Sequence, residues 1–72
     1  MVELEFWDER RALTIARVPA RDAVPIPSAG DVVYIPDVDQ TGVYLHIRVG
    51  SRQFYYSQEG GLVTIRLLCD SL

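Results

Sequence analysis

The fold is decided by residues 43–67, which read VYLHIRVGSRQFYYSQEGGLVTIRL. Apolar and polar residues alternate before Gly50 and again from residue 63 onward, which is the period of a strand with one buried face. The loop Gln58–Gly61 contains the paired glycines that hairpin connections favour. Residues 52–57 and 62–67 are therefore predicted to form a hairpin, preceded by a further strand over residues 43–49.

The inward-facing positions change parity within this stretch. They are odd-numbered before Gly50, whereas Phe54 and Tyr56 are the best inward candidates after it. One extra residue at Gly50–Ser51 reconciles the two sets, so a β-bulge or a short turn is predicted there. Such a bend lets few strands close into a small barrel. Closing the hairpin loop pairs Tyr56 with Val63, Phe54 with Ile65, Tyr55 with Thr64, and Gln53 with Arg66.

Prolines and glycines divide the chain upstream of this hairpin. Pro19–Gly30 is predicted to be an ordered crossover, because its prolines favour extended geometry and its composition is too apolar for a disordered linker. It ends in the turn Pro27–Asp31, where Gly30 can supply a positive φ. A short strand, Val32–Ile35, and a second turn, Pro36–Gly42, follow.

The N-terminal segment also alternates, with Val2, Leu4 and Phe6 on one face. The polar cluster Asp8–Arg11 separates it from a second apolar stretch, Ala12–Val18. A hairpin through this cluster places the large apolar residues on one face, with Phe6 opposite Leu13, Leu4 opposite Ile15, and Glu5 opposite Thr14. The alternative is a short helix over Asp8–Arg17 with Asp8 as its N-cap.

Length and composition limit the class of protein. The length of 72 residues predicts a single domain, 1–72. Hydrophobic residues make up 49% of the sequence, which indicates a packed core. Short strands with Gly/Pro turns predict an all-β fold, a small partly open barrel of five to six antiparallel strands with little or no helix. Cys69 and His46 are the only residues of their kinds, which excludes an internal disulfide and the usual zinc ligand sets. We expect a cytoplasmic protein without a signal peptide, membrane span or cofactor.

A resemblance supports the barrel. Ile26–Ile35 reads IPSAGDVVYI and resembles the P-x-x-G-D-x-V opening of SH3-like small barrels, in which a turn delivers the first core strand. The whole layout is similar to that of short uncharacterised bacterial proteins found in phage and mobile-element gene cassettes. The resemblance implies a fold and no catalytic residues.

Several residues are candidates for chemistry, and each has a structural interpretation. Asp37–Gly42 matches the opening of a calcium loop and a D-x-D-x-T motif, but Arg48 stands where the bidentate Glu of a calcium loop belongs, so a turn is predicted. His46 is interpreted as a surface residue and Cys69 as an inert thiol. Glu3 and Glu5 are interpreted as a solvated strand face. No catalytic residue or metal site is predicted.

One group is a candidate binding surface, because strand parity turns its members outward together. Tyr and Arg are enriched at protein-binding hot spots. The group consists of Tyr44, His46, Arg48, Gln53, Tyr55 and Arg66, with Arg52 as a further member. Trp7 is expected either to extend this surface or to cap the end of the barrel.

The predicted function is a noncatalytic binding or assembly module that acts through a sheet face or a strand edge on a protein partner or on itself. Binding of single-stranded nucleic acid by stacking is an alternative, which the net charge of −3 disfavours. A small enzyme or ligand-binding protein is a third class. A further alternative is that the outward group is an exposed sheet face that binds no partner. No membrane partner is expected.

Overall fold

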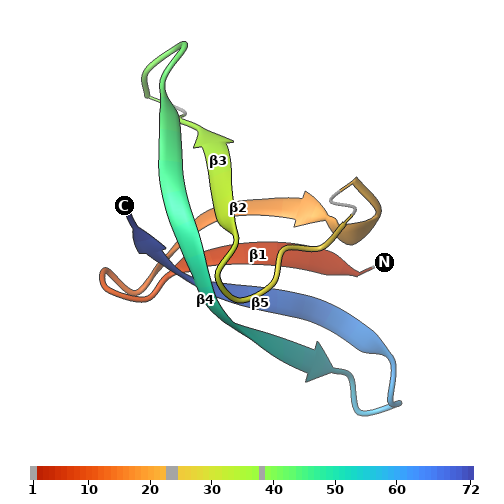
Figure 1. Ribbon diagram of the computed structural model, residues 1–72. Helices are drawn as coiled ribbons and strands as arrows, with labels where there is room; N and C mark the ends of the chain where they lie inside the picture. The colour runs from red at the N-terminus through yellow and green to blue at the C-terminus, as the bar shows by residue number, and fades with distance from the viewer. Residues whose placement is uncertain (1, 23–24, 38) are drawn as a thin grey trace.

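A computed structural model describes residues 2–22, 25–37 and 39–72, whose strands form one curled sheet (Figure 1). The strands are β1 Glu3–Asp8, β2 Leu13–Pro19, β3 Val32–Pro36, β4 Tyr44–Tyr56 and β5 Leu62–Ser71, with one short 3-10 turn at Ala20–Asp22. Their order across the sheet is β2-β1-β5-β4-β3. The all-β, partly open barrel predicted from the sequence is confirmed. No helix of the described residues is long and apolar enough to cross a membrane.

One strand pair departs from the antiparallel prediction. β1 and β5 run parallel, with Glu3 opposite Thr64 and Asp8 opposite Cys69. Parallel neighbours need a long crossover between them, and here residues between β1 and β5 supply it. Local hairpin patterns contain no information about this pairing, so the sequence prediction missed it.

The β4–β5 hairpin has almost the predicted register. Gln53 lies opposite Arg66, Phe54 opposite Ile65, and Tyr55 opposite Thr64, as predicted. Tyr56 lies opposite Leu62, and not opposite Val63 as predicted, because the register shifts by one residue beside the loop. The predicted bulge is confirmed at Gly50: Val49 pairs with Cys69 and Ser51 with Leu68, which leaves Gly50 without an opposite residue.

The N-terminal segment is the predicted hairpin, and the helical alternative over Asp8–Arg17 is wrong. Its register also differs from the prediction, since Leu4 lies opposite Val18 and Phe6 opposite Ala16. The buried carboxylate of Asp8 accepts hydrogen bonds from the backbone N–H groups of Arg10 at 3.0 Å and Arg11 at 3.1 Å. These bonds fold residues 9–12 into a loop of their own, after which Asp8 lies opposite Leu13. A register shift between Phe6 and Trp7 then moves the pairing by one more residue.

The two turns that flank β3 have the expected local chemistry. Gly30 has a φ of 94°, as predicted for the turn before β3, and donates a hydrogen bond to the carbonyl of Val49 at 2.8 Å. In the turn after β3, the Asp37 carboxylate accepts a hydrogen bond from the N–H of Asp39 at 2.9 Å. Residues 23–24 of the predicted crossover and Val38 of the second turn lie outside the described residues.

The core lies on one face of the sheet, and we name this the core face. Its buried apolar side chains are Leu4, Phe6, Ile47, Val49, Ile65, Leu67 and Cys69. Phe54 and Tyr56 were predicted inward, and Phe54 does share the core face with Ile65, the buried residue opposite it. Both are nevertheless exposed, by 48% and 63%, because β3 pairs only with residues 44–48 of β4. The core face thus continues beyond the core as an uncovered aromatic strip.

Candidate functional site

A buried carboxylate lies on the opposite face of the sheet, which we name the outer face. Glu5 belongs to the central strand β1, and its side chain is only 4% exposed. Its register partners are both arginines, Arg17 on β2 and Arg66 on β5. The prediction of a solvated strand face is therefore wrong for Glu5. It holds for Glu3, whose side chain is 49% exposed.

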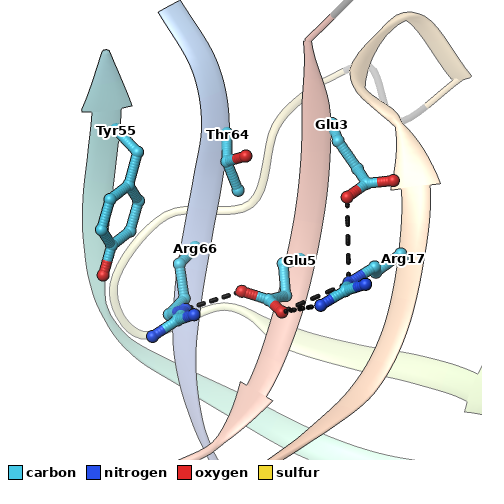
Figure 2. A pocket seen from close by; sticks show the side chains of 6 residues that line it. All are labelled: Glu3, Glu5, Arg17, Tyr55, Thr64 and Arg66. Carbon is cyan, nitrogen blue, oxygen red and sulfur yellow. Dashed lines mark hydrogen bonds and ion pairs between the residues drawn. The ribbon is translucent and has the colours of Figure 1, made fainter. Parts of the chain in front are cut away.

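Three side chains satisfy both oxygens of this carboxylate, and Figure 2 draws two of them, Arg17 and Arg66. Arg66 donates from Nε to Oε1 at 2.6 Å. Arg17 donates from Nη2 to Oε2 at 3.0 Å, and the Thr14 hydroxyl donates to the same oxygen at 2.8 Å. Figure 2 shows the two arginines reaching Glu5 from the strands on either side. A buried charge is tolerated when it is paired and hydrogen-bonded in this way.

The protonation of Glu5 follows from these contacts. Burial acts to raise the pKa of Glu5, but the hydrogen bonds from Thr14, Arg66 and Arg17 outweigh it and lower the pKa from 4.5 to about 2. The same contact with Glu5 raises the pKa of Arg66. Glu5 is therefore a permanent anion near neutral pH and a poor proton acceptor. Its effect is to hold cationic side chains in place.

Arg66 is also held by two aromatic rings on the outer face. Its guanidinium carbon lies 4.4 Å from the ring centroid of Trp7 on β1 and 5.3 Å from that of Tyr55 on β4. Both distances are within the range of cation–π attraction. The Tyr55 hydroxyl donates to the side-chain oxygen of Gln53 at 2.9 Å. We name this arrangement the Trp7–Arg66–Tyr55 stack.

A shallow depression of about 240 Å³ adjoins the stack. It is lined by Glu3, Glu5, Arg17, Tyr55, Thr64 and Arg66, four of which are charged with equal numbers of each sign. The depression therefore has no net charge that would select an anionic or cationic ligand, and its polar floor is already hydrogen-bonded through Glu5.

The predicted binding residues divide into separate groups. Gln53, Tyr55 and Arg66 come together, as predicted, through the β4–β5 pairing. Tyr44 and His46 lie near the other end of β4, where the His46 ring packs edge-on against Tyr34 with centroids 4.5 Å apart.

The remaining predicted members have different positions. Arg48 is exposed between these groups, opposite Asp70. Arg52 was placed in the outward group wrongly: it lies opposite buried Leu67 on the core face, 5.7 Å from the Phe54 ring centroid. Trp7 is half-buried in the stack, and is therefore part of the surface it was expected to extend.

Sequence reasoning missed Glu5, Arg17 and Thr14 as parts of this site. Outward parity of Glu5 and Arg66 was visible in the sequence, but their proximity depends on the parallel β1–β5 pair. Arg17 depends on the register of the first hairpin, which was predicted with Thr14 opposite Glu5 in its place.

The other candidate groups have ordinary environments. His46 is exposed, as the sequence predicted. Cys69 is buried in the core, and burial raises the pKa of its thiol from 9.0 to about 11, so the reactive thiolate is disfavoured. Across residues 2–22, 25–37 and 39–72, no three His, Cys, Asp or Glu side chains gather closely enough to hold a metal ion.

Comparison of the chain with known proteins found no relative. No protein-family model matches the chain, and neither a curated protein nor a solved structure matches it.

Proposed function

We propose that this chain is a noncatalytic protein-binding module whose docking surface is the Trp7–Arg66–Tyr55 stack. The observation that carries the proposal is the position of Arg66, which buried Glu5 holds between two aromatic rings on the outer face. Trp, Tyr and Arg are the residue types most enriched at protein-binding hot spots.

Preorganisation is the main physical support. Immobilising a long side chain on binding costs roughly 0.5–1.5 kcal/mol, and rigid anchors avoid this cost. The Arg66 side chain is 29% exposed and already fixed by its ion pair with Glu5, so a partner meets an ordered guanidinium edge flanked by rings. Its ordering entropy is lost on folding and not on binding.

Charge supports a protein partner over nucleic acid. The chain carries seven basic and ten acidic residues, and the lining of the depression beside the stack is neutral. Binding to phosphate backbones depends on an excess of cationic contacts. The proposal includes a cytoplasmic location, in keeping with the single cysteine. The resemblance to SH3-like bacterial barrels stays a prediction.

In-cell photocrosslinking tests the proposal. The photoreactive residue p-benzoylphenylalanine replaces Tyr55 in one variant and Tyr34 in a matched control, which is also an exposed outer-face tyrosine. We expect a discrete protein adduct from position 55 in the cells that encode the chain, and none of the same mass from position 34. Absence of a discrete adduct at position 55, or an adduct with nucleic acid, would contradict the proposal.

The identified partner then permits a quantitative check. Tyr55→Ala and Arg66→Gln should each weaken its binding by about tenfold or more, since truncating a hot-spot side chain costs at least 1–2 kcal/mol. Tyr44→Ala removes a ring of similar exposure at the far end of β4 and should leave the affinity within about twofold. Equal losses for all three variants would show that the stack has no special role.

A further inference from the structure

Strand edges are the second kind of surface on which this sheet can act. Within the described residues, β2 and β3 are the outermost strands, so each has one unpaired side. β4 has an unpaired side as well, since β3 covers only residues 44–48 and no described strand pairs with that side of residues 51–56. Unpaired N–H and C=O groups make such an edge a template for another strand.

The edges of β2 and β3 each have a proline at the last residue of the strand. Asp37 donates to the Val43 carbonyl, so by the alternation of an antiparallel ladder Pro36 directs its nitrogen to the free side of β3. Ala20 donates to the Val2 carbonyl, and the same alternation turns Pro19 to the free side of β2. Proline has no N–H to offer there, which is a common protection of edge strands.

The edge of β4 has no such protection. Ser57 donates to the Gly61 carbonyl, so alternation leaves Arg52, Phe54 and Tyr56 with their N–H and C=O groups directed away from β5. All residues from 51 to 56 are exposed. The segment contains no proline and includes three consecutive aromatic residues, which favour strands.

We propose that residues 51–57 of β4 pair antiparallel with the same residues of a second copy of the chain, about a two-fold axis at Phe54. Residue numbers of opposite partners then sum to a constant value, as an isologous contact requires. Phe54 meets Phe54 of the partner copy, Arg52 meets Tyr56, and Gln53 meets Tyr55. The proposal is independent of the docking function of the stack.

The side chains of this segment complement themselves in that register. Arg52 already lies over the ring of Phe54, and it gains a second ring from Tyr56 across the junction. Tyr55 already hydrogen-bonds Gln53 within the chain, and the same pair recurs between copies. Like charges directly opposite each other would destabilise the pair, and this register contains none.

Pairing of this kind also covers the aromatic strip. Phe54 and Tyr56 are exposed because the sheet ends beside them, and a neighbouring β4 would extend the core face past this point. The outer faces of both copies become continuous, which places two Trp7–Arg66–Tyr55 stacks on one surface. The contact is small, so we expect weak association, with a dissociation constant of roughly 100 μM.

Charges introduced at the two-fold axis test both the edge that pairs and the register of the pairing. Sedimentation equilibrium of the wild-type chain up to about 1 mM should show a mass approaching twice that of one chain. Phe54→Glu and Phe54→Lys place like charges opposite each other, and each should remain monomeric. An equimolar mixture of these two variants should recover the dimer, because Glu then meets Lys.

Controls separate this result from misfolding. Far-UV circular dichroism and thermal unfolding should match between the wild-type chain and both charged variants. If either fails to fold, Arg52→Pro replaces it, since this change removes an edge-directed N–H and keeps the β4–β5 hydrogen bonds; it should be monomeric. A monomeric wild-type chain at about 1 mM, or folded charged variants whose mixture stays monomeric, would overturn the proposal.

The proposed dimer and the proposed docking function can be disproved by separate results. A photocrosslinked adduct from position 55 with twice the mass of the chain identifies the second copy, whereas an adduct of another mass identifies a different protein. A monomeric wild-type chain does not change the expected loss of partner affinity in Tyr55→Ala.

Discussion

Glu5 combines two properties that oppose each other in most proteins, full burial and permanent charge. Its carboxylate is removed from water but receives hydrogen bonds from Arg66, Arg17 and Thr14. Arg66 is the more buried arginine and makes the shortest of these bonds, so it is the arginine that the carboxylate holds most closely. Removing one partner from such a group is costly, because it leaves a buried charge uncompensated in a low-dielectric environment.

Glu5→Gln should therefore destabilise the fold by about 2–3 kcal/mol, since it leaves two arginines facing a neutral amide. Urea unfolding followed by tryptophan fluorescence measures the change, with Trp7 as the reporter. Glu3→Gln is the matched control on the same strand. Its carboxylate is half-exposed and 3.8 Å from Arg17, so its loss should cost less than about 0.5 kcal/mol. Equal costs for the two variants would contradict the role assigned to Glu5.

The low pKa of Glu5 predicts how stability depends on pH. The unfolded chain binds a proton at Glu5 near pH 4.5, whereas the folded chain resists this until about pH 2. The stabilisation is complete above the higher value and is lost as pH falls through this window. The stability difference between the wild-type chain and Glu5→Gln should shrink accordingly from neutral pH to about pH 2.5. Urea midpoints for both proteins test this prediction. A stability difference that stays constant with pH would contradict the low pKa of Glu5.

At the scale of elements, local patterns predicted the β4–β5 hairpin well. The change of parity around Gly50 identified the bulge, and the glycines of the loop set most of the register. The first hairpin was predicted less well, because its register depends on the loop that Asp8 caps and on a register shift between Phe6 and Trp7, and not on the apolar pattern alone. Asp8 was interpreted as a loop residue, yet it is the buried end of β1 and caps the loop that follows.

The same loop contains a residue with an unfavourable backbone conformation. Ala12 has a φ of 54°, in the left-handed region that glycine occupies at little cost. Ala12→Gly should therefore stabilise the chain by about 0.5–1 kcal/mol. Ala16→Gly, on the following strand, is the control and should destabilise by about 1 kcal/mol, since a strand residue gains only flexibility. Thermal midpoints that fall for both variants would show that the loop is not strained at Ala12.

At the scale of the molecule, the site depends on contacts between distant segments. Gln53, Tyr55 and Arg66 were predictable as neighbours because one hairpin joins them. Trp7 and Glu5 reach Arg66 only through the parallel β1–β5 pair. No local pattern encodes that pairing. The exposure of Phe54 was unpredictable for a related reason: it depends on where β3 stops covering β4.

The central claim is that Arg66 is already ordered in the free protein, and its side chain offers the most direct measurement. Nitrogen-15 relaxation of the Arg66 Nε–H group, with nuclear Overhauser contacts to both rings, reports order in solution. We predict a slowly exchanging Nε–H as rigid as the backbone, with contacts to Trp7 and Tyr55, and loss of this order in Glu5→Gln. A rapidly exchanging, mobile guanidinium without contact to Trp7 in the wild-type chain would contradict the claim.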